Sequence, residues 1–233
     1  MNTFSEGRVL LIDKPLRWTS FDVIRQVRNV IDIKKVGHAG TLDPLATGLL
    51  IVCTGKFTKN INEYMAREKE YTGSITLGSV TPTYDLESEP TDHKPYNHLN
   101  NEEIHAATKD FIGEILQVPP AHSAIKIDGK RVYELARKGR EVKLEPRKLT
   151  VHVFEITSIE LPKVFFRVNC STGTYIRSLA HDFGARLGCG GHLSSLRRTK
   201  IGEFDVADAF TMDQFREEYQ TSDPVDHLPV GDD

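Results

Sequence analysis

The chain has 233 residues, 39% of them hydrophobic, which is enough to bury a sizeable core in one large domain or two small ones. No apolar run approaches the roughly 20 residues that span a bilayer, and the N-terminus lacks the long apolar core of a secretory signal. Three cysteines are too few, and odd in number, for a disulfide framework, so reduced thiols in a cytoplasmic protein are expected.

The net charge of −3 hides two oppositely charged parts. Residues 203–233 hold ten acidic residues and one arginine, so residues 1–202 carry a net charge of +6. Within that basic part, residues 125–148 have nine basic and four acidic side chains. A basic body suits an anionic partner such as nucleic acid, which the total charge alone would argue against.

In chain order, the first elements predicted are a strand and a helix. Residues 9–12 form an apolar run that Asp13, Lys14 and Pro15 end, as expected for a strand. Thr19 can cap the helix that follows, and apolar side chains recur on one face of that helix up to about Ile31.

The most informative stretch is residues 36–55, VGHAGTLDPLATGLLIVCTG. Its apolar end, residues 49–53, predicts a buried strand, and the glycine-rich residues before it predict a shaped loop rather than a helix. Pro44 keeps Asp43 out of the helical region, so the loop presents one carboxylate at a fixed place. Taken alone, these residues are described more simply as an Asp-Pro turn before a strand.

Further elements follow from the same periodicities. Residues 78–99 are rich in Pro, Asp and Glu and predict a polar loop. Gly55-Lys56 lacks the earlier glycine of a phosphate-binding loop, and Cys189 with His192 lacks a second ligand pair for a metal. Helices are predicted over residues 56–65, 102–111, 132–138 and from after Gly173 to about residue 187, and strands over residues 69–77, 122–127, 149–161 and 164–170.

Residues 37–48, GHAGTLDPLATG, resemble the catalytic signature of the TruB family of tRNA pseudouridine synthases. The resemblance implies an α+β fold with a single catalytic domain, residues 1–202, around a mixed, largely antiparallel sheet flanked by helices. Residues 203–233 would be an acidic extension in place of the PUA-type RNA-binding domain of longer relatives. The other segments that match the family are residues 13–15, 69–71, 120–126, 129–133, 173–177 and 188–198.

The resemblance also implies roles for seven residues. Asp43 would be catalytic, Arg177 would pair with it, and Tyr71 would stack on the target base. The substrate would be bound by four further residues: Tyr175, Leu196, Lys14 and His38.

The implied reaction converts uridine 55 in the T arm of tRNA to pseudouridine. It is an isomerisation, so no cofactor, metal or energy source is expected. A carboxylate suits it because it can attack carbon or remove a proton. The sequence leaves open whether Asp43 attacks C1′, attacks C6 or removes a ribose proton. The expected partner is the T stem-loop of tRNA, with no membrane and no obligate protein partner.

Two other classes of protein agree less well with the sequence. A non-catalytic RNA-binding protein or tRNA-folding chaperone would not need Asp43, Tyr71 and Arg177 together. A nucleoside hydrolase-like glycosidase would need a second carboxylate or a metal, for which the sequence offers no convincing candidate. Residues 81–88 depart from the family pattern, because its first aspartate and its glycine are missing while Asp85 remains.

Overall fold

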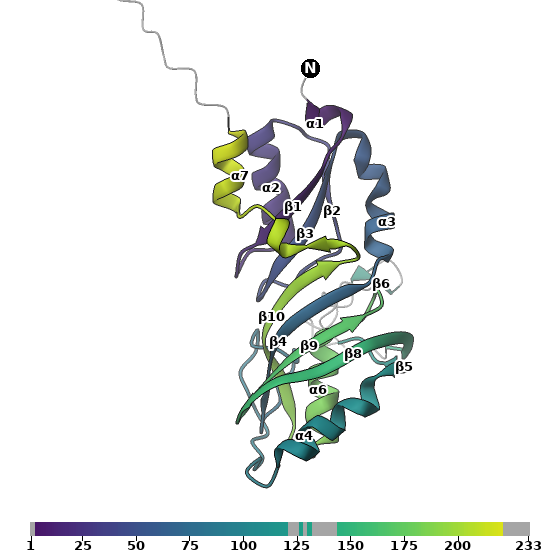
Figure 1. Ribbon diagram of the computed structural model, residues 1–233, viewed down its shortest axis with the longest axis vertical. Helices are drawn as coiled ribbons and strands as arrows, with labels where there is room; N and C mark the ends of the chain where they lie inside the picture. Colours follow the sequence, from purple (N-terminus) through teal and green to yellow (C-terminus); the bar gives the residue numbers. More distant parts are fainter. Residues whose placement is uncertain (1–2, 121–125, 128–129, 132–143, 221–233) are drawn as a thin grey trace, which may run out of the picture.

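The computed structural model describes residues 3–120, 126–127, 130–131 and 144–220, and most of its strands form one sheet with helices packed against it (Figure 1). The strands are β1 Val9–Lys14, β2 Val36–Ala39, β3 Ala46–Thr54, β4 Lys69–Leu77, β5 Gly113–Gln117, β6 Lys126–Ile127, β7 Lys130–Arg131, β8 Arg147–Glu160, β9 Lys163–Cys170, β10 Gly191–Ile201 and β11 Phe204–Asp205.

The helices are α1 Thr3–Glu6, α2 Ser20–Ile31, α3 Ile61–Ala66, α4 Asn101–Ala107, α6 Ile176–Arg186 and α7 Met212–Tyr219. Short 3-10 helices are η1 Gly55–Asn60, η2 Thr108–Phe111 and η3 Val206–Asp208. Among the described residues, no helix is both long and apolar enough to cross a membrane.

The strand order of the large sheet is β1-β3-β10-β4-β9-β8-β5, with β2 also on β3 and β11 also on β10. Its strand pairs are antiparallel except for β3 with β10, which run parallel. The sheet is therefore mixed and largely antiparallel, which confirms the predicted fold class.

The N-terminal half is built on β1 and β3, with α2 and α7 packed against them (Figure 1). Thr19 caps α2 in a reciprocal capping box with Asp22, as the sequence predicts for this helix start. The buried apolar stripe of α2 packs in one cluster with β1 and β3, and Met212 and Phe215 of α7 belong to the same cluster. Within the predicted extension of residues 203–233, helix α7 therefore packs on the N-terminal half.

The other half contains β4, β9, β8 and β5, with α6 behind the sheet and α4 below it in Figure 1. Edge-to-face contacts link Phe154, Phe166 and Phe183, the last of which comes from α6. α6 also approaches β10 very closely, because a Cβ on Gly184 would lie 2.1 Å from the amide nitrogen of Gly191. This close packing holds the last turns of α6 against the start of β10.

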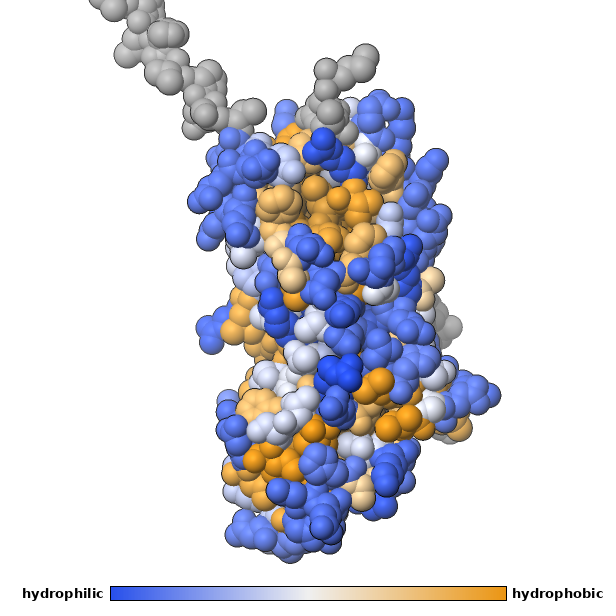
Figure 2. Space-filling view, in the orientation of Figure 1, coloured by the Kyte–Doolittle hydropathy of each residue, from blue (hydrophilic) through white to orange (hydrophobic). Residues whose placement is uncertain are grey.

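β10 joins the two halves. It pairs with β4 along most of its length, but its parallel pairing with β3 covers only residues 196–198 opposite residues 46–48. Figure 2 shows a hydrophilic band across the middle of the open sheet face. On the sheet, Arg167 forms ion pairs with Glu70 at 3.0 Å and with Glu155 at 2.9 Å.

Some predicted elements were wrong. Residues 36–39, expected in a loop, form β2, because their backbone pairs with β3 and the small Gly37 fits where a Cβ would lie 2.8 Å from Ile61 Cδ1. Residues 56–65 divide between η1 and α3. The predicted helix 102–111 begins at Asn101, with Asn100 as its cap, and it changes to η2 at Thr108.

The side chain of Thr108 explains that change of helix type, because its hydroxyl donates to the carbonyl of His105 at 2.8 Å and so competes with the regular ladder of backbone hydrogen bonds.

The predicted helix over residues 132–138 and most of the predicted strand over 122–127 lie outside the described residues. Residues 126–127 do form a short strand, which pairs with residues 130–131.

Candidate active site

A cleft of about 630 Å³ lies where the two halves meet. Its walls come from the loop between β2 and β3, from β4, from the turn between β9 and α6, and from β10. The fold thus brings together five of the residues singled out from the sequence, namely Asp43, Tyr71, Tyr175, Arg177 and Leu196.

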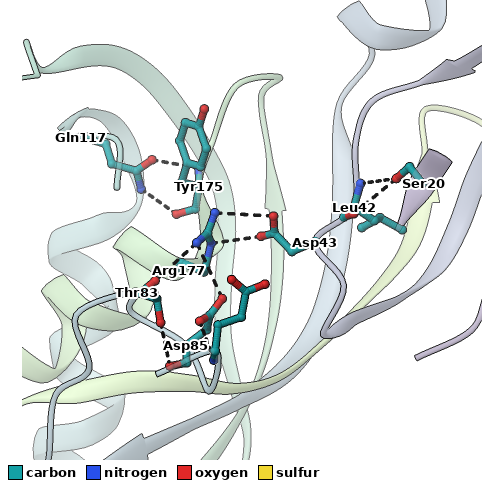
Figure 3. A network of polar contacts seen from close by, with 9 residues as sticks. Ser20, Leu42, Asp43, Thr83, Asp85, Gln117, Tyr175 and Arg177 are labelled. Carbon is teal, nitrogen blue, oxygen red and sulfur yellow. Dashed lines mark hydrogen bonds and ion pairs between the residues drawn. The ribbon is translucent and has the colours of Figure 1, made fainter. Parts of the chain in front are cut away.

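The loop that carries Asp43 is anchored on both sides of the carboxylate. Ser20, at the start of α2, accepts a hydrogen bond from the amide of Leu42 at 2.9 Å and donates to its carbonyl at 3.3 Å (Figure 3). The amide of Ala46 donates to the carbonyl of Asp43 at 3.0 Å, and the amide of Arg17 donates to that of Pro44 at 2.8 Å. These bonds fix the aspartate at the cleft wall.

Asp43 and Arg177 form a two-point ion pair. Arg177 Nε lies 3.0 Å from Asp43 Oδ2, and Nη2 donates to Oδ1 at 3.5 Å (Figure 3). The Arg177 side chain is 6% exposed, whereas that of Asp43 is 39% exposed and so can reach a bound molecule. Enclosure by the cleft walls raises the pKa of Asp43, while the guanidinium lowers it; the net direction is upward.

A second carboxylate faces the same arginine. Arg177 Nη1 lies 3.7 Å from Asp85 Oδ2 and donates to the carbonyl of Thr83 at 3.4 Å. Asp85 is buried, and its Oδ1 accepts from the amide of Glu87 at 3.0 Å. Asp85 was not among the residues predicted to form the site. The sequence did contain one indication of its role: residues 81–88 lack two residues of the family pattern but keep Asp85.

Tyr71 and Leu196 line the cleft from neighbouring strands. Tyr71 on β4 is directly opposite Arg198 on β10, and Leu196 is opposite Gly73. Burial raises the pKa of the Tyr71 hydroxyl, and the nearby Arg198 guanidinium lowers it. Arg198 is itself buried, donating to the carbonyls of Leu49 at 2.8 Å and Gly40 at 3.1 Å. Sequence analysis did not single out Arg198, although it lies inside a matched segment.

Tyr175 is held by its backbone at the residue before α6. Gln117, at the end of β5, donates to the carbonyl of Tyr175 at 3.0 Å and accepts from its amide at 2.9 Å (Figure 3). Gln117 is buried, so this pair of hydrogen bonds gives the strand-to-helix turn a fixed position beside Arg177.

Lys14 and His38 are placed differently, because neither is among the residues that line this cleft. Lys14 is fully buried and donates to the carbonyls of Trp18 at 2.6 Å and Pro15 at 3.0 Å. Burial lowers the pKa of its ammonium to about 8, against the raising effect of Asp43. Burial likewise lowers the pKa of His38, which lies on β2 just before the Asp43 loop.

The two residues of the rejected metal pattern have other neighbours. Cys189 donates to the carbonyl of Gly190 at 3.3 Å, and His192 Nδ1 lies 3.3 Å from the carbonyl oxygen of Ser79. Within the described ranges, no three His, Cys, Asp or Glu side chains are grouped so that they could hold a metal ion.

Comparison with known families places the chain among modifying enzymes of one type. Residues 28–176 match the TruB family pseudouridylate synthase N-terminal domain, and residues 177–228 match the tRNA pseudouridylate synthase B C-terminal domain. The chain therefore belongs to the TruB family of pseudouridylate synthases, which confirms the predicted family and enzyme class.

Curated relatives agree over nearly their full length. A protein from Flavobacterium johnsoniae named tRNA pseudouridine synthase B is 54% identical over 224 residues, covering 93% of this chain and 98% of the relative. One of the same name from Phocaeicola vulgatus is 48% identical, covering 92% and 94%.

Among solved structures, the crystal structure of a Cbf5-Nop10-Gar1 complex contains a similar chain. It matches with a TM-score of 0.71 and 32% identity. The match covers 93% of this chain but only 55% of the other one.

Proposed function

We propose that this chain converts uridine 55 in the T arm of tRNA to pseudouridine, in the cytoplasm, with Asp43 as its catalytic residue. The observation that carries the proposal is the two-point pair of Asp43 with the buried Arg177, inside a cleft that Tyr71 and Leu196 also line. The names of the curated relatives support tRNA as the substrate.

The chemistry requires an ionised carboxylate. The N1–C1′ bond breaks, a C5–C1′ bond forms, and the proton lost from C5 is balanced by one taken up at N1. Attack of Asp43 on C1′, attack on C6 and removal of a ribose proton all use the charged form. Burial in the cleft destabilises the ionised carboxylate. The guanidinium of Arg177 stabilises it in part through two contacts, which also fix the direction of the carboxylate.

The remaining residues would hold the base and the RNA. Tyr71 stacks on the uracil, with Leu196 and Tyr175 lining the same pocket. A uridine within folded RNA must first be flipped out, at a cost of a few kcal/mol, and we assign His38 the role of filling the space that it leaves. Lys14 fixes the turn of residues 15–18 through its bonds to the carbonyls of Pro15 and Trp18, and the amide of Arg17 in that turn donates to the carbonyl of Pro44 beside Asp43. The basic body, with its net charge of +6, binds phosphates.

The test is to incubate transcribed tRNA with the purified chain and to map pseudouridine. We expect product at position 55 without added cofactor. Asp43→Asn should give none, while the Kd for tRNA stays within about threefold, because phosphate contacts supply most of the affinity.

A matched control is Asp110→Asn, because the Asp110 carboxylate also pairs with an arginine, Arg186 at 2.5 Å, but on the exposed surface. This control should keep full activity. Product formed by Asp43→Asn, after mass spectrometry has excluded deamidation, would overturn the catalytic assignment. Product at another position would overturn the assignment of the target uridine.

A further inference from the structure

The loop of residues 81–88, here the Asp85 loop, holds a tyrosine in an unusual backbone conformation. Tyr84 has a φ of +64°, in the left-handed region that bulky residues rarely adopt. Its amide donates to the carbonyl of Thr81 at 3.1 Å, and its carbonyl accepts from the amide of Leu193 at 2.9 Å. Such a conformation persists only where the surrounding structure enforces it.

The ring of Tyr84 is stacked on an imidazole of the helix that carries Arg177. Its centroid lies 3.9 Å from that of His181, with 18° between the planes. His181 is four residues after Arg177 on α6, so both side chains lie on one face of the helix, one turn apart. Nδ1 of His181 is buried and has no hydrogen-bond partner among the described residues.

Two neighbours on the loop thus contact two neighbours on the helix: Asp85 faces Arg177, and Tyr84 faces His181. The contact of Asp85 with Arg177 is long, at 3.7 Å, and the bond from Arg177 to Thr83 is also long, at 3.4 Å. The aromatic stack is a further contact between this loop and α6, at 3.9 Å between the ring centroids.

We propose that the Tyr84–His181 stack is a positioning device for the reaction: it holds Asp85 against Arg177 and so sets the direction in which Arg177 meets Asp43. Tyr84 and His181 are positioning residues that do not touch the substrate. The inference rests on the proposed function, because it matters only if the Asp43–Arg177 pair is catalytic.

The first experiment compares three replacements of Tyr84 in the full chain, measuring kcat and tRNA Kd. Tyr84→Ala should lower kcat about tenfold with Kd unchanged, because small displacements of catalytic groups have large effects on rate. Tyr84→Phe, which keeps the ring, should restore the rate. Tyr84→Gly, which tolerates the left-handed backbone but lacks the ring, should be as slow as Tyr84→Ala. Glu89→Ala, an exposed change just beyond the loop, is the control and should match wild type.

The second experiment asks whether Tyr84 acts through Asp85. In an Asp85→Asn background, Tyr84→Ala should cause no further loss of single-turnover rate, because the group that it positions is already gone. Independent losses that multiply would overturn the proposal, as would a wild-type rate for Tyr84→Ala or recovery by Tyr84→Gly. Thermal unfolding of each variant identifies any that fail to fold, and His181→Phe, which keeps a stacking ring, then repeats the test from the helix side.

Failure of the proposed function would look different. In that case wild type would make no pseudouridine, or Asp43→Asn would remain active. An active wild type with an inactive Asp43→Asn and an unaffected Tyr84→Ala would refute the positioning device alone.

Discussion

Replacing Arg177 by lysine separates positive charge from planar geometry at the site. The guanidinium contacts Asp43 at 3.0 and 3.5 Å through two nitrogens and Thr83 through a third. A single ammonium nitrogen can reproduce one contact to the carboxylate and lacks the fork that fixes its direction. One lost hydrogen bond to a charged group corresponds to about 1.5–3 kcal/mol. Applied to the transition state, that loss lowers kcat by about 10- to 150-fold.

The assay for Arg177→Lys is tritium release from tRNA labelled at C5 of uridine, with tRNA affinity measured separately. We expect kcat to fall while affinity stays close to wild type, because the buried arginine contributes little to phosphate binding. Arg186→Lys is the matched control on the same helix, since its guanidinium pairs with Asp110 at the exposed surface. A wild-type kcat for Arg177→Lys, or a loss confined to binding, would refute the proposed role of the pair.

Three further predictions concern pH, backbone and metal. The pKa of Asp43 is raised above 3.8, so the ionised form is lost early on acidification and kcat should fall with a midpoint above 3.8; a midpoint at or below that value would contradict the assignment. Gly48→Ala should destabilise the fold by more than about 2 kcal/mol, because φ is +101° and the added Cβ would meet the Arg198 carbonyl oxygen at 2.3 Å. Gly188→Ala, at φ +79° in open space, should have a smaller effect in the same denaturant titration, and equal effects would refute the steric argument. After the RNA is folded with magnesium, a chelator that does not bind magnesium should leave turnover unchanged, whereas a loss restored by zinc would support a metal site at Cys189 and His192.

Local elements could be predicted where the sequence carries its own signals. The cap at Thr19 and the apolar stripe after it define α2, and the alternation of polar and apolar residues over 69–77 predicts β4 with both ends correct. β2 was missed because its glycine reads as a loop residue, and only pairing with β3 stabilises it as a strand. The parallel contact of β3 with β10 joins residues about 150 positions apart, so no local pattern could reveal it.

The candidate site depended on resemblance more than on local physics. Asp43 and Arg177 are 134 residues apart, and nothing near either residue indicates the other. The placement of Asp85 could not be predicted because it depends on how residues 81–88 fold over α6. The left-handed backbone of Tyr84 could not be predicted either, since tyrosine rarely adopts that conformation.

The short parallel contact between β3 and β10 has a mechanical consequence. Only three register pairs join the strands there, and the side chains of two consecutive arginines on β10 form further bonds to β1 and β3. Arg197 bonds Asp13 at 2.6 and 3.0 Å, and Arg198 bonds the carbonyl of Leu49. Leu42 and Ala46, which flank the Asp43 turn, belong to the same buried cluster as Tyr71 and Leu193 across the seam. The seam and this shared core together set the separation of Asp43 from Tyr71, so a change that loosened either one would alter the width of the cleft.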